Sequence, residues 1–228
     1  MTRLLTVPAL LAALLTLSAC GTEPEPMPVS EKNADRAPEA LTYTTGDNVY
    51  INDMFSLRIE KPEGWFAQSA EDMILMQQQG SALFSDDDNI RQILKASLES
   101  TLPLFGFFEV PPGTPGRLNP NILGTAENIR LAPGITSGCD YLAHARQALQ
   151  QMQIRYEVDE QCGQREINGT DFGYFEAQAM FGSQLVRQRY LALVRDKHAI
   201  VVVQSFFDED SEALVNAVLD TLTMQGSL

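Results

Sequence analysis

The sequence predicts an α+β fold, an α/β/α sandwich in which helices flank both faces of a mostly antiparallel central sheet. The last third of the chain carries the two observations behind this class. Asn168-Gly169 is the turn dipeptide of a tight hairpin and opens an antiparallel meander. Ala199–Phe207 is almost continuously apolar, which indicates a strand covered on both faces. The expected strands of the meander are 164–167, 172–181, 185–194 and 199–207, and a helix follows over Ser211–Thr223.

Residues 1–19 are typical of a removable secretory signal. Arg3 precedes an uncharged apolar run that is too short for a membrane span, which needs about 20 apolar residues. The end of this signal segment, Leu17-Ser18-Ala19-Cys20, resembles the bacterial lipobox. In a lipobox the cysteine thiol is acylated, and the signal peptide is cleaved just before the cysteine. The resemblance implies a lipoprotein with a palmitate-type anchor on Cys20. An ordinary signal peptide with a chance cysteine is the alternative.

The lipobox resemblance also bears on the compartment. In Gram-negative relatives an Asp after the cysteine retains the protein at the inner membrane, and Gly21 stands there in this chain. This favours the outer membrane, with the protein facing the periplasm. A single acyl chain binds a membrane only marginally, whereas the two or three chains that the resemblance implies give stable attachment.

Residues 20–41 are rich in proline and charge and are expected to form a lipidated, disordered tether. Residues 42–228 suit one globular domain with its own core. The chain carries a formal net charge of −14. This charge argues against nucleic acid and against electrostatic adhesion to anionic lipid, since both require a positive patch.

The first half of the domain shows strands and helices in alternation. Val49–Asn52 and Phe55–Lys61 are expected to be strands, and Ala70–Gln78 a helix. Asp86-Asp87-Asp88-Asn89 precedes another helical pattern. The cluster lacks the alternating ligands and turn glycine of a calcium loop, so its carboxylates are interpreted as helix caps.

Leu104–Val110 is an apolar strand stopped by two prolines, and a further strand is expected near Glu127–Leu131. If the first of these lies at a sheet edge, Phe105, Phe107 and Phe108 could form a strip that binds a partner segment. If it is central, the three rings belong to the core.

Cys139 and Cys162 are expected to form a disulfide. Residues 139–152 have helical periodicity and advance about 21 Å. A strand over residues 154–161 would return about 26 Å and bring Cys162 back to the helix start. Closing that loop would contribute about 3 kcal/mol. Two buried free thiols are the alternative, and a metal pair lacks a third ligand nearby.

The order of landmarks resembles the PsbP-like and DcrB-like group over about residues 48–225. The similar features are the Phe55–Pro62 strand followed by Gly64-Trp65, the stretch Asn119-Pro120-Asn121-Ile122, and the closing meander with its helix. The group contains extrinsic photosystem proteins, periplasmic lipoproteins and adaptor chaperones. The resemblance implies an α/β/α sandwich without a shared enzymatic activity, whose members mostly bind other proteins.

No catalytic, cofactor or metal motif stands out in the sequence. The two histidines, His144 and His198, fall on a helix and in a hairpin turn, without a nucleophile pattern beside them. Gly134–Gly138 is similar to a nucleophile elbow, but Thr136 holds the nucleophile position and no strand precedes it directly. Carboxylate pairs are interpreted as a solvated acidic face.

The sequence therefore favours a non-enzymatic, membrane-anchored module that binds or assembles with a protein partner. A carrier or sensor of a small apolar ligand is the second hypothesis, and a hydrolase built from carboxylates is the third. An apolar pocket of a few hundred Å³ would favour the carrier. A buried carboxylate pair with raised pKa values would favour the hydrolase.

Overall fold

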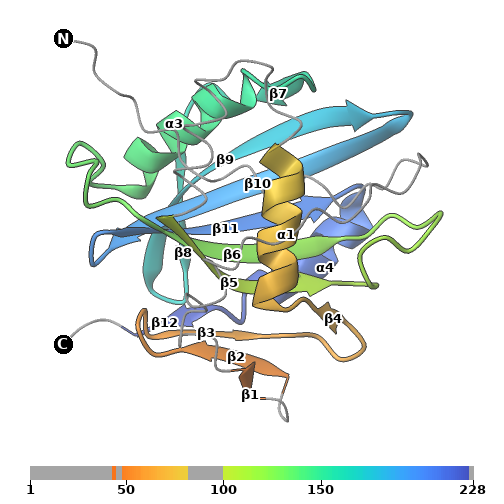
Figure 1. Cartoon of the computed structure of the whole chain (residues 1–228), viewed down its shortest axis with the longest axis horizontal. Coiled ribbons are helices and arrows are strands. Elements are labelled where there is room, and N and C mark those ends of the chain that lie inside the picture. Colours follow the sequence, from red (N-terminus) through yellow and green to blue (C-terminus); the bar gives the residue numbers. More distant parts are fainter. Residues whose placement is uncertain (1–42, 45–47, 82–99, 226–228) are drawn as a thin grey trace, which may run out of the picture.

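The computed structural model describes residues 43–44, 48–81 and 100–225 of the chain. The signal segment, the whole tether with Cys20, and the helix expected after Asp86–Asn89 lie outside the described residues. The described residues form a mixed α/β fold with a large antiparallel sheet (Figure 1). This confirms the predicted combination of helices with a mostly antiparallel sheet.

The large sheet has eight strands, and every pairing in it is antiparallel. Seven strands follow one path and the eighth, β8, pairs with β9 beside β7. In path order the strands are β4 (Phe66–Ala67), β5 (Thr101–Phe108), β6 (Asn121–Asn128), β11 (His198–Phe206), β10 (Gln184–Arg195), β9 (Thr170–Phe181) and β7 (Tyr156–Val158), with β8 at Gly163–Ile167.

The predicted meander is confirmed as β8, β9, β10 and β11, each within two residues of its expected bounds. Asn168 and Gly169 have φ angles of 48° and 79°, the left-handed pair that a tight hairpin turn requires. The Asn168 side chain also donates hydrogen bonds of 2.8 Å to the carbonyls of Asp220 and Leu222. The turn is thereby fixed to the segment that follows the last helix.

The first face of the large sheet is covered by α1 (Ala70–Ser81) and α3 (Gly138–Leu149). Met73 of α1 and Tyr141, Leu142 and Ala145 of α3 pack in one buried cluster with Phe175 of β9 and other side chains of the sheet. Figure 1 shows both helices on the near side of the sheet. The helix α3 begins with a capping box between Ser137 and Asp140, which satisfies its first free amides.

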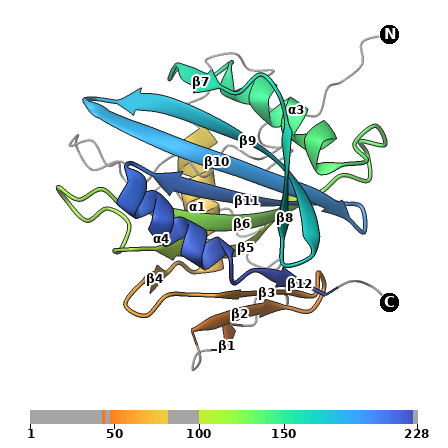
Figure 2. The same cartoon turned by 180° about the vertical axis from the view of Figure 1, so that it is seen from behind.

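The second face is covered by α4 (Glu209–Leu219) together with a smaller sheet (Figure 2). The small sheet has the order β1-β2-β3-β12, with β1 at Tyr43–Thr44, β2 at Val49–Asn52, β3 at Leu57–Glu60 and β12 at Thr223–Met224. Its Tyr50, Leu57 and Ile59 join Val218 and Leu219 of α4 in the second buried cluster. The sequence did not predict this sheet, because β1 and β12 are too short to show periodicity.

The strand expected near Glu127–Leu131 is wrong in its position, because β6 spans Asn121–Asn128. Asn121 and Gly124 are poor strand formers, which favoured a loop at this point. Hydrogen-bonded neighbours on both sides, β5 and β11, override that preference. Gly124 also has a packing role, since an added Cβ would lie 2.3 Å from the Phe105 ring.

The structure contains the expected disulfide between Cys139 at the start of α3 and Cys162 just before β8. The return strand β7 is shorter than predicted, Tyr156–Val158 instead of 154–161. The disulfide lies directly above the sheet: a Cβ added at Gly173 of β9 would come within 2.8 Å of the Cys139 sulfur. Only glycine at this position lets the bridge approach the strand so closely.

We expect reduction of the disulfide to lower the free energy of unfolding by about 3 kcal/mol, because a loop with a sequence separation of 23 residues is released in the unfolded chain. Urea unfolding of the oxidised and reduced domain measures the difference. The Cys139→Ser/Cys162→Ser double variant is the control and should unfold identically with and without reductant. Equal midpoints for the oxidised and reduced wild type would contradict a stabilising bridge.

Candidate functional site

The aromatic strip considered as a partner-binding surface is wrong. Phe105, Phe107 and Phe108 expose 0%, 1% and 0% of their surface. Phe105 and Phe107 pack in the second buried cluster, while Phe108 packs in the first. The strand β5 has β6 on one side and β4 and Gln68 along part of the other, so its rings are core, the alternative that the sequence left open.

Two observations concern metal-binding and acidic side chains in the described part of the chain. The described residues contain no group of three His, Cys, Asp or Glu side chains that could hold a metal ion. One buried carboxylate, Glu127, accepts a 2.7 Å hydrogen bond from the Tyr141 hydroxyl. Burial, together with this carboxylate, raises the pKa of Tyr141 well above its ordinary value, so the phenol stays protonated. We interpret this pair as a polar contact that fixes α3 to β6.

No helix in the described part of the chain is both long and apolar enough to span a bilayer.

A cleft of about 390 Å³ opens on the second face of the large sheet, beside the first turns of α4. We call it the acidic cleft. Its lining residues are Glu157, Val158, Asp159, Glu176, Ala177, Gln178, Arg187, Phe206 and Glu212. Four carboxylates and one exposed arginine therefore surround a concave surface that reaches the edge strand β7.

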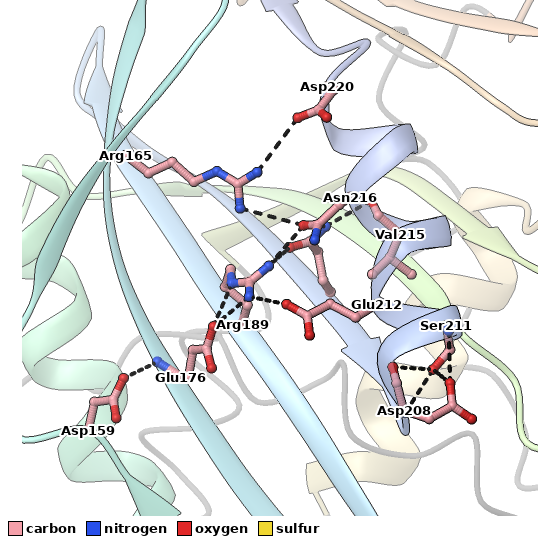
Figure 3. Close-up of polar contacts among 11 residues, drawn as sticks. Asp159, Arg165, Glu176, Arg189, Asp208, Ser211, Glu212, Val215, Asn216 and Asp220 are labelled. Carbon is pink, nitrogen blue, oxygen red and sulfur yellow. Dashed lines mark hydrogen bonds and ion pairs between the residues drawn. The ribbon is translucent and has the colours of Figure 1, made fainter.

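A buried arginine lies at the inner side of this cleft (Figure 3). Arg189 of β10 exposes 8% of its surface, and its guanidinium is 2.6 Å from a carboxylate oxygen of Glu176 on β9 and of Glu212 on α4. It also donates to the side-chain oxygens of Asn216, at 2.9 Å, and Gln204, at 3.3 Å. All five N–H groups of a guanidinium can be used in this arrangement. The arginine therefore joins β9, β10, β11 and α4.

Arg189 is also stabilised by the ring of Phe206, whose centroid lies 5.4 Å from the guanidinium carbon. Burial alone would lower the pKa of Arg189, but the hydrogen bonds and charges of Glu212 and Glu176 raise it above its ordinary value. The guanidinium is therefore permanently charged. It fixes the position of one oxygen of Glu176 and one of Glu212 at the wall of the cleft.

The N-terminus of α4 positions Glu212. Asp208 is the N-cap, and its carboxylate accepts hydrogen bonds from the amide and hydroxyl of Ser211 at 2.8 Å and 2.5 Å. The Ser211 hydroxyl and then its amide lower the pKa of Asp208. Glu212 follows in the first turn, where the helix dipole favours a negative charge. A single cap therefore sets where this carboxylate enters the cleft.

The opposite wall of the acidic cleft belongs to β7 and its pairing with β9. Glu157 accepts a 2.6 Å hydrogen bond from the Gln178 side chain. Asp159 accepts one of 2.9 Å from the Glu176 amide, while its own amide donates to the Glu176 carbonyl. Each acidic side chain of this wall is thus fixed by a neighbour. No serine, cysteine or histidine is among the residues that line the cleft.

Sequence reasoning missed this cleft, because its residues come from β7, β9, β10, β11 and α4. One signal was present. Arg189 shares the strand face of Leu191 and Leu193, which pack in the second cluster, so an arginine occupies a core-facing position of a predicted strand. A charge at such a position requires a partner, and Glu176 lies directly opposite it in the strand register.

No protein-family model matches the sequence, and no curated protein matches it. Similar solved structures include the cyanobacterial PsbP, CyanoP, of Synechocystis sp. PCC 6803, at 11% identity and a TM-score of 0.46, covering 83% of this chain and 100% of that one. LpqN, involved in cell envelope biogenesis of Mycobacterium tuberculosis, is 13% identical with a TM-score of 0.41, covering 75% and 84%. The resemblance to PsbP proteins that the sequence suggested is therefore supported at the level of the fold alone.

We expect Arg189→Met to lower the free energy of unfolding by about 2–3 kcal/mol. Removing one partner of a buried ion pair costs about 3–5 kcal/mol, and the value is smaller here because the carboxylates reach water. Arg187→Met is the matched control, on the same face of the same strand but exposed, and should change stability by less than about 0.5 kcal/mol. Chemical denaturation measures both, and equal effects would contradict a specific role for Arg189.

We expect the Asp208 cap to stabilise the fold at neutral pH and to lose this effect in acid. Because the folded-state pKa lies below the ordinary value of 3.8, the contribution is complete above that value and disappears as the pH falls through the folded pKa. Asp208→Asn keeps a good N-cap without a titrating group. The stability difference between wild type and this variant should therefore change between pH 5 and acid of about pH 2. A pH-independent difference would argue against the cap.

Proposed function

We propose that this protein is a lipoprotein, anchored by acylated Cys20 to the outer membrane and facing the periplasm. Its folded domain is a non-enzymatic module that binds a protein partner. The partner contributes a cationic segment that enters the acidic cleft. The observation that carries the proposal is the arrangement of Glu157, Glu176 and Glu212 around an open concave surface next to an edge strand.

The chemistry of the acidic cleft favours recognition over catalysis. Arg189 and Gln178 hold carboxylate oxygens in place, so little side-chain entropy is lost when a lysine or arginine of a partner binds. Charged groups of this kind steer a partner of opposite charge and determine its orientation. The edge strand β7 adjoins the same surface, where a partner backbone could pair.

The membrane anchor rests on the lipobox resemblance of Leu17–Cys20 and on the tether that follows. The disulfide supports export, because such bonds form and persist in oxidising compartments such as the periplasm. A carrier of apolar ligands receives less support, since charged and polar side chains dominate the acidic cleft and its one aromatic residue, Phe206, is only 1% exposed.

Crosslinking in intact cells tests the proposal. We expect the wild-type protein to capture a discrete partner with a basic segment, and Glu157→Lys to reduce this capture strongly, because the variant places a cation in the cleft. The matched control is Glu63→Lys, an equal change of charge at an exposed residue that does not line the cleft.

Equal loss of capture in both variants would assign the effect to overall charge and contradict the proposed site. Mass spectrometry of the natively produced protein tests the anchor separately. We expect a mature chain that begins at an acylated Cys20, and an unmodified N-terminus would overturn that part of the proposal.

A further inference from the structure

Three turns that lie far apart in the sequence meet at one end of the sandwich. They are the β2–β3 turn at residues 53–56, the loop at 129–132 after β6, and the β10–β11 turn at 195–198. The Ile129 amide donates to the Lys197 carbonyl at 2.9 Å, and Arg195 donates to the Phe55 carbonyl at 3.1 Å. Figure 1 shows all three on the left side. We call this surface the tether end.

The tether end carries the two most exposed large apolar side chains of the described residues. Leu131 exposes 91% of its surface and Met54 exposes 61%. Neither belongs to a buried cluster. Both lie on turns, where their apolar surface stays in contact with water and contributes no hydrophobic stabilisation. Exposed apolar groups that gather on one surface are typical of a site that contacts another molecule or a membrane.

The direction of β1 relates the start of the domain to this surface. In the antiparallel pair of β1 and β2, Tyr43 lies opposite Tyr50 and Thr44 opposite Val49. Because β2 runs toward the turn at 53–56, the antiparallel β1 runs away from it, and Tyr43 is the residue of β1 nearer to that turn. A flexible tether of about 20 residues spans only about 25 Å, so an anchor at Cys20 would keep this end close to the lipid.

The charged side chains also differ between the two ends of the sheet. On the three turns, exposed Arg130 and Lys197 balance exposed Asp53 and Asp196, in a chain whose net charge is −14. The acidic cleft lies at the other end of the sheet. In the β10–β11 ladder, Arg187 and Arg195 mark the two ends, about 27 Å apart. An anionic lipid surface therefore repels the cleft end most strongly.

We propose that the tether end is a membrane-contact surface, which inserts Leu131 and Met54 into the interfacial region of the bilayer that carries the anchor. This orientation turns the acidic cleft away from the lipid and toward the periplasm, where a partner can reach it. The inference rests on the proposed acylation of Cys20.

Depth-dependent fluorescence quenching tests this orientation. The natively acylated full chain is produced as a Leu131→Cys variant, in which the added thiol is the only free one, because Cys20 is acylated and Cys139 is bonded to Cys162. It is labelled with an environment-sensitive fluorophore and reconstituted in phosphatidylcholine–phosphatidylglycerol vesicles that contain a lipid-attached quencher. The matched control is Met180→Cys, 54% exposed on β9 near the β9–β10 turn, toward the cleft end.

We expect the label at position 131 to shift to the blue and to be quenched, since it would lie within about 10 Å of the headgroup boundary. The label at position 180 should keep its emission in water and resist quenching. Adding Met54→Asp to the Leu131→Cys chain should reduce the quenching at position 131, because a carboxylate opposes insertion of the turn.

Equal quenching at both positions, or stronger quenching at position 180, would overturn the orientation while leaving the anchor intact. Flotation of the same vesicles separates this result from a failure of the anchor. If the chain does not float with the vesicles and mass spectrometry finds no acyl group on Cys20, the proposed anchor falls and the membrane contact falls with it.

Discussion

Arg189 is the buried charge on which the second face of the large sheet depends. Its guanidinium is shared by carboxylates of β9 and α4 and by side-chain oxygens of β11 and α4, so one side chain determines where the last helix rests. An unpaired guanidinium in this position would be strongly destabilising. The same residue divides the face in two: Leu191 and Leu193 continue into the apolar core on one side, and Arg187 lines the cleft on the other.

The cleft follows from how the two faces are covered. On the first face, α1 and α3 pack on the sheet, and the disulfide fixes the start of α3 above Gly173. On the second face, α4 begins beside the cleft and packs with the small sheet in the second buried cluster. Beyond this cover, Glu176 binds Arg189, Gln178 binds Glu157 of β7, and Arg187 is exposed. A polar concave surface is the consequence of a sheet that is longer than its cover.

The two ends of the domain therefore differ in physical character. One end has the most exposed apolar side chains and balanced charge. The other end has carboxylates that a neighbouring arginine and glutamine hold in place. This difference between the two ends suits a protein attached to a membrane, because anchoring and partner binding would then use opposite ends of one sheet. The proposed lipid anchor, partner site and membrane contact share this single geometric basis.

The sequence by itself determined the local structure: the Asn168-Gly169 hairpin, the meander, the periodicity of α3 and α4, and a disulfide whose spacing matches one helix and a return segment. These depend on interactions between residues near one another in the chain. Only the tertiary structure decided that β6 begins at Asn121, that Phe105 and Phe107 are buried, and that β12 pairs with β3. It also assembled the cleft from Glu157, Glu176 and Glu212. Each of these outcomes depends on a partner strand or helix that is distant in sequence, so no local pattern encodes it.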